Sequence, residues 1–228
     1  MADSEARRDR LLLALTFAAG CVDALSYLGL SRVFTANMTG NAVLLGLAIG
    51  QTQELQVAHS SAAIVGFVAG VLLGARLVGP SRERVIWSPR VTAAVGLEAA
   101  VLVVFAIGWW VTGPASRGSN LIGLIVLSGL AMGIQSAVAR RLAVPGVSTT
   151  YVTGTITSLI AELTSVSGAV GDRRRMTAVI GALVAGAVTG GVAQAYARPA
   201  AAVVPALVVA IVVAMGRIPS PPPGERAG

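Results

Sequence analysis

Five apolar stretches that contain few charges constrain the fold of this chain more than any other feature of its sequence. A helix needs about 20 predominantly apolar residues to cross the hydrocarbon core of a membrane, and stretches of about 18 or more are candidates. A sixth apolar stretch is marginal in length. The five stretches are 11–30, 60–79, 91–112, 121–139 and 176–196, and the sixth is 200–216. We therefore expect a polytopic membrane protein.

The composition supports this expectation. Hydrophobic residues make up 55% of the chain and charged residues 12%, and the mean hydropathy is +0.79. In soluble domains the charged share is about a quarter. The lipid bilayer is thus the first partner that the sequence predicts.

The basic residues carry topology information rather than a nucleic-acid site. The net charge is +7, all 17 basic residues are arginine, and they gather at the ends of the apolar stretches. No basic face is interleaved with aromatic side chains on which bases could stack, so we expect no nucleic-acid partner. Trp109 and Trp110, at the end of one stretch, are placed where an outer aromatic belt would anchor it.

Segment 33–50 contains a polar motif inside apolar surroundings, and a second copy of this motif follows later in the chain. The tripeptide Thr-Gly-Asn at 39–41 recurs as Thr-Gly-Thr at 153–155, an offset of 114 residues. Residues 39–50 form a helix of only about 18 Å, against a hydrocarbon core of about 30 Å. We therefore consider two topologies, in which both motif segments either cross the membrane or enter and return on the same side.

The arginines favour the second topology. Eight spans would place nine arginines inside and eight outside, whereas six spans with two re-entrant segments place 14 inside and leave only Arg32, Arg117 and Arg198 outside. The positive-inside rule expects such a bias. We predict a multi-pass protein of the bacterial cytoplasmic (inner) membrane with both termini in the cytoplasm.

The halves of the chain read as repeats of inverted topology. Val-Ala-Gly at 68–70 with Gly74 recurs at 184–186 with Gly190, an offset of 116 residues. The first half begins inside and the second begins outside, an arrangement common among transporters. The predicted fold class is therefore all-α, with six transmembrane helices, two re-entrant or broken half-helices and an inverted internal repeat.

The predicted organisation is as follows: a cytoplasmic N-terminal segment 1–10; repeat one 11–112, with spans 11–30, 60–79 and 91–112 and the re-entrant motif 33–50; a linker 113–119; repeat two 120–216, with spans 121–139, 176–196 and 200–216 and the re-entrant motif 147–166; and a disordered cytoplasmic tail 217–228.

Segments 20–24, 34–41, 132–135 and 149–155, which hold Asp23 and both Thr-Gly motifs, resemble the YoaK family of bacterial inner-membrane proteins of unknown function. The resemblance extends from about Leu11 to Gly216. One departure is Ser136, after Gln135, where the family pattern leads us to expect Asn. The resemblance implies the membrane class and brings no substrate.

The paired motifs predict a transporter or channel. A helix N-terminus inside the membrane presents unpaired N–H groups and about half a positive charge, which favour an anion or a carbonyl-bearing solute. We expect a small polar or anionic solute at the midplane between the two motifs, with Gln135 in the place that Asp23 has in the first half. The predicted binding residues are Asp23, Asn37, Thr39, Gly40, Asn41, Gln135, Thr153, Gly154 and Thr155.

Three alternatives stay open. Asp23 is either a coupling or substrate-binding carboxylate or a structural acceptor for the broken backbone of the first motif. Glu98 is either functional, or it pairs with an arginine or caps a neighbouring helix end. The protein is either a transporter or a non-catalytic scaffold or sensor that binds other membrane proteins through glycine faces. With one histidine, one cysteine and no metal-ligand cluster, we expect no enzyme, no catalytic residue, no metal and no cofactor. A homo-oligomer is compatible with the sequence.

Overall fold

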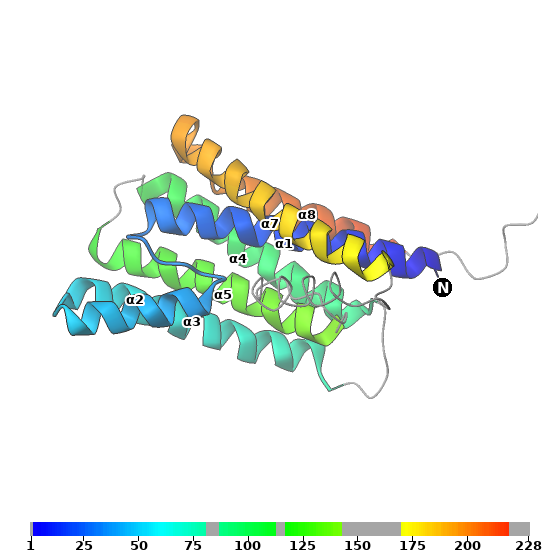
Figure 1. Cartoon of the computed structure of the whole chain (residues 1–228), viewed down its shortest axis with the longest axis horizontal. Coiled ribbons are helices and arrows are strands. Elements are labelled where there is room, and N and C mark those ends of the chain that lie inside the picture. Colours follow the sequence, from blue (N-terminus) through cyan, green and yellow to red (C-terminus); the bar gives the residue numbers. More distant parts are fainter. Residues whose placement is uncertain (1, 81–86, 113–116, 143–169, 219–228) are drawn as a thin grey trace, which may run out of the picture.

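The computed structural model describes residues 2–80, 87–112, 117–142 and 170–218, and within these ranges every regular element is a helix. The elements are α1 (Ala2–Gly29), α2 (Met38–Gly50), α3 (Glu54–Val78), α4 (Pro89–Thr112), α5 (Gly118–Leu142), α7 (Val170–Tyr196), the short 3₁₀ helix η1 (Arg198–Ala200) and α8 (Val203–Arg217). They form one bundle, in which α2, at 13 residues, is the apolar α-helix too short to be a candidate span (Figure 1).

Six helical segments in the described ranges are long and apolar enough to cross a membrane, and they coincide with the six predicted stretches. The marginal sixth stretch reaches this length because η1 and α8 together cover Arg198–Arg217. The outer side of α7 is apolar, since Val184, Val188 and Val192 are all exposed. A helix that is apolar on its outer as well as its inner face is suited to lipid rather than water. The expected all-α polytopic membrane protein is confirmed.

Helices α3 and α5 pack backbone against backbone. A Cβ added at Gly66 would lie 2.6 Å from the carbonyl oxygen of Val126, and at Gly74 it would lie 2.9 Å from the Cβ of Ala137. Glycine allows so close an approach because it has no side chain. Contacts move forward along both helices together, so α3 and α5 run parallel.

Helices α1 and α7 pack in the same manner and are also parallel (Figure 1). A Cβ at Gly186 would meet the carbonyl of Phe17, and a Cβ at Gly190 would lie 2.6 Å from the carbonyl oxygen of Cys21. Cys21 is buried in this interface, as expected for a residue of the core.

Helix α4 connects the two pairs, since it packs against α5 and α8, and α8 packs against α1. Trp109 lies in this interface and is buried, and its indole Nε1 donates to the carbonyl oxygen of Arg198 at 2.8 Å. The expectation of a belt residue is therefore wrong for Trp109, because its indole packs inward, whereas Trp110 is exposed.

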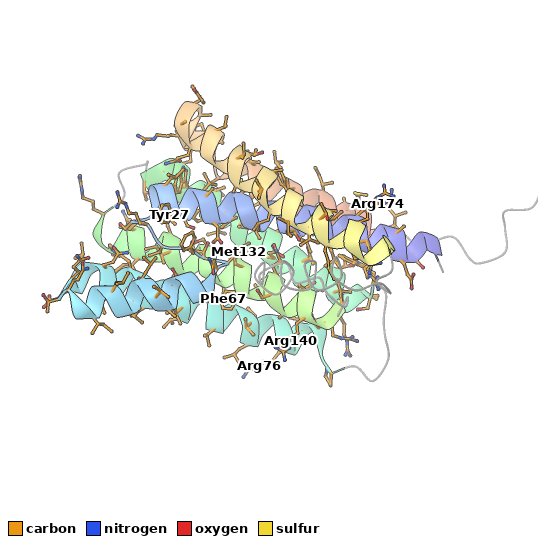
Figure 2. The ribbon with its side chains drawn as sticks, viewed as in Figure 1. Tyr27, Phe67, Arg76, Met132, Arg140 and Arg174 are labelled. Carbon is orange, nitrogen blue, oxygen red and sulfur yellow. The ribbon has the colours of Figure 1, made fainter. Side chains whose placement is uncertain are left out.

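The two ends of the bundle differ in character. In Figure 2, Arg140 and Arg174 lie in the half of the bundle that holds the N-terminus, and Tyr27 lies in the opposite half. The six-span topology predicts that Arg140 and Arg174 share the cytoplasmic side with the N-terminus, and their common half of the bundle agrees with this.

Candidate functional site

The first motif turns back into the bundle before α2 begins. After α1 ends at Gly29, Ser31 and Arg32 adopt positive φ angles of 62° and 60°, which reverse the chain. Residues 33–37 are non-helical, and α2 then begins at Met38 and returns toward the end at which α1 stops (Figure 1). The sequence predicted a half-helix from Thr39, one residue later. At 13 residues, α2 is about 20 Å long, so its N-terminus lies well inside the bundle.

Asp23 holds this non-helical backbone in place. Its Oδ1 accepts from the backbone N–H groups of Thr35 and Ala36, both at 2.7 Å, and its Oδ2 accepts from the N–H of Asn37 at 3.1 Å. Backbone amides inside a membrane bundle need acceptors from the protein, because lipid offers none. This geometry favours the structural alternative for Asp23, since all three bonds go to the chain itself.

Asn41 is the second side chain that binds the backbone of the motif. Its side chain is 0% exposed, its Oδ1 accepts from the N–H of Phe34 at 2.9 Å, and its Nδ2 donates to the carbonyl of the same residue. Gly40 lies under the ring of Phe34, and a Cβ there would be 2.9 Å from Cδ2. The Phe34 ring in turn stacks on Tyr27, with centroids 5.1 Å apart. Asn41 and Gly40 are therefore engaged in packing the motif.

Asn37 and Thr39 are the polar side chains of the motif that remain exposed. Asn37 caps α2 by accepting from the N–H of Gly40 at 3.2 Å. The hydroxyl of Thr39 makes no hydrogen bond with the described residues, and the first two helical amides, those of Met38 and Thr39, are likewise left without an acceptor there. These groups at the start of α2 are the part of the predicted site that can contact a solute.

Ser26 belongs to this cluster, although it is not among the binding residues predicted from the sequence. Its hydroxyl donates to the carbonyl of Asp23 at 3.1 Å and contacts the buried hydroxyl of Thr35 at 3.4 Å. The signal was present, because a residue three positions after Asp23 lies on the same face of a helix.

Gln135 is buried on α5, away from the first motif. Its Nε2 donates to the carbonyl of Leu15 on α1 at 3.0 Å, and its Oε1 has no partner among the described residues. It thus joins two helices rather than contacting the start of α2.

The glycine contacts favour a particular register for the predicted repeat. A Cβ at Gly20 would meet Leu183 and Ala187 of α7, and a Cβ at Gly133 would meet Phe67 and Val71 of α3. Within the predicted repeat, these contacts match Gly133 with Gly20, and this register pairs Asp23 with Ser136 rather than with Gln135.

The second motif, with the predicted binding residues Thr153, Gly154 and Thr155, lies outside the described residues. The meeting of the two motifs therefore stays a prediction. In the described ranges, no group of three or more His, Cys, Asp and Glu side chains could hold a metal ion.

Comparison with known proteins identifies the family. The family described as "Protein of unknown function (DUF1275)" matches residues 11–215, nearly the whole chain. The chain belongs to this family. The UPF0700 transmembrane protein YoaK of Bacillus subtilis (strain 168) is 43% identical over 159 residues, which cover 69% of this chain and 68% of that protein. The YoaK resemblance is thus confirmed, and the protein is a multi-pass transmembrane protein. No solved structure matches the chain.

Proposed function

We propose that this member of the family is a channel or transporter for a small polar solute, which passes the start of α2 inside the bundle. The observation that carries the proposal is the non-helical segment 33–37, which leads into the bundle and is followed by a half-helix. Non-helical backbone at membrane depth is tolerated where protein buries it or where it lines an aqueous cavity. Discontinuous helices of this kind form the substrate sites of many transporters.

Matched helix pairs support an inverted repeat as the framework of this site. Helix α1 packs on α7 through Gly20, Gly186 and Gly190, and α5 packs on α3 through Gly133, Gly70 and Gly74. The contacts of these three glycines in one pair have their counterparts in the other when α1 is matched with α5 and α3 with α7. The contact between α1 and α8 likewise corresponds to the contact between α5 and α4. This is the exchange expected of a pseudo-two-fold axis, and it supports re-entrant motifs in both halves.

Asp23 narrows the chemistry of the solute. A free helix N-terminus favours an anion, but the Asp23 carboxylate already occupies the amides of residues 35–37. A second negative charge beside it would be repelled. Between the two classes that the sequence predicts, a neutral polar solute therefore fits the described half of the site better than an anionic one.

Flux into proteoliposomes tests the proposal. Reconstituted protein is given labelled neutral amides and polyols in one set of vesicles and labelled small carboxylates in another. We expect the wild type to admit members of the neutral set, and Thr39→Val to reduce this flux because it removes the exposed hydroxyl at the start of α2. Thr189→Val is the matched control, since the Thr189 hydroxyl bonds only the carbonyl of Ala185 in its own helix. If protein-free vesicles admit the solutes as fast as vesicles with the wild type, the protein does not transport them. If wild type and Thr39→Val give equal flux, the motif has no part in the mechanism.

The scaffold alternative loses support from the same glycines. The glycines at spacing four on α3 are covered by α5, and Gly186 and Gly190 on α7 are covered by α1 of the same chain. They are not available to other membrane proteins. The solute and the bilayer remain the partners that we propose, and the orientation that we propose is both termini in the cytoplasm of a bacterial cell.

A further inference from the structure

Glu98 is a buried acid of α4 that the first motif does not involve. Its side chain is 0% exposed, and neither carboxyl oxygen has a hydrogen-bond partner in the part of the chain that the structure describes. It lies in the middle of the buried row of α4, between Val95 and Leu102. An acid inside a membrane bundle is costly unless it is paired, and such residues are usually functional.

Glu98 lies at the same depth as Gln135. Helices α4 and α5 follow each other in the chain and pack together, and a Cβ at Gly108 of α4 would lie 3.0 Å from the side chain of Leu124 of α5. From this contact, ten residues along α4 lead to Glu98 and eleven along α5 lead to Gln135. At about 1.5 Å per residue, the two depths agree to within about 2 Å. Gln135 Oε1 and the hydroxyl of the next residue, Ser136, are also buried without a partner among the described residues.

The helices packed against α4 bring no described countercharge to this depth. Arg76 of α3 is exposed, and no ion pair joins Glu98 to a described side chain. The other charged or titratable groups lie toward the ends of their helices. They are Arg90 on α4, Arg140 and Arg141 on α5, Arg217 on α8, Arg198 on η1, and Glu54 and His59 on α3.

We propose that Glu98 is a proton-binding site of the bundle, whose carboxyl takes up and releases a proton as the solute moves. The coupling part rests on the proposed function. Uptake forms one O–H bond on the carboxyl and breaks one in a hydronium ion or buffer acid, and no electron is transferred. A proton needs a single acceptor, whereas a bound metal cation needs several oxygen ligands, and the described residues offer no such acidic cluster. Gln135 and Ser136 place buried polar atoms without a described partner at the depth of Glu98.

Infrared difference spectroscopy of the full chain in lipid tests the proton site without a solute. We expect a carbonyl-stretch band from a protonated carboxyl that shifts in D₂O, and we expect Glu98→Gln to remove it. Glu54→Gln, which changes an exposed acid at the start of α3, should leave the band in place. If Glu98→Gln does not fold, Glu98→Asp should instead move the band, because it keeps the carboxyl and shortens the side chain. A spectrum without the band, or a band that never exchanges in D₂O, would overturn the proposal.

A flux assay separates this proposal from the proposed function. In proteoliposomes with an imposed pH gradient, the wild type should take up solute faster than without the gradient. Glu98→Gln should keep the downhill flux and lose the effect of the gradient. If Glu98→Gln keeps the gradient effect, coupling through Glu98 is wrong while transport stands. If the wild type shows no flux at all, the transport function fails, and the infrared band alone decides whether Glu98 binds a proton.

Discussion

Replacing Asp23 tests the claim that its carboxylate holds the non-helical segment inside the bundle. Asp23→Ala removes the acceptor of three backbone N–H groups, of which those of Thr35 and Ala36 belong to buried residues and that of Asn37 is exposed. An unsatisfied buried donor costs about 1–3 kcal/mol. Two such donors make Asp23→Ala destabilising by about 2–6 kcal/mol, with the exposed third amide adding little. Asp23→Asn keeps one oxygen that can accept from Thr35 and Ala36, so it should cost less.

The assay combines thermal unfolding in detergent with limited trypsin digestion. Arg32 is exposed in the reversal before the motif, so a segment released by Asp23→Ala should be cut there faster than in the wild type. We expect the order of stability to be wild type, Asp23→Asn, Asp23→Ala, with Glu54→Gln unchanged as the control for loss of an exposed acid. If Asp23→Ala has the melting temperature and the Arg32 cleavage rate of the wild type, the carboxylate is not what holds the segment.

Two further predictions concern packing and topology. Gly70→Leu should prevent folding, because its side chain would overlap the backbone of Leu130 and Gly133, whereas Gly123→Leu should be tolerated, because no atom lies within 4 Å of a Cβ there. Yield and monodispersity in size-exclusion chromatography measure the folding of both variants. Equal behaviour of the two variants would contradict the α3–α5 contact. In a Cys21→Ser background, Gln53→Cys should react with a membrane-impermeant thiol reagent added outside cells, and Glu83→Cys should not. The reason is that six spans with a re-entrant motif place positions 53 and 83 on opposite sides of the membrane. The reverse labelling would support eight spans.

The sequence predicted the helices well and the roles of the polar residues less well. Apolar stretches long enough to span a membrane leave the backbone few alternatives to a helix, so all six spans were found. The start of α2 was also found to within one residue, because polar residues inside an apolar region indicate a break. The role of Asp23 depends on contacts with residues 35–37, more than ten positions later, and spacing alone could not choose between a ligand for solute and an acceptor for backbone. The repeat stays a prediction, and the contacts of Gly20 and Gly133 favour a register one residue away from the one that the sequence suggested.

Hydrogen bonding separates the polar residues of this bundle into two kinds. Asp23 and Asn41 drew attention because polar groups in a membrane are costly, yet each is engaged by the backbone of the motif and stabilises it. Glu98 carries the same cost with no described hydrogen bond to offset it. A group that the native contacts satisfy is maintained by folding alone, whereas an unsatisfied acid lowers stability. A buried acid of that kind is best explained by a ligand that binds and is released. We therefore propose that Glu98 binds a proton and that Asp23 holds the backbone of the motif.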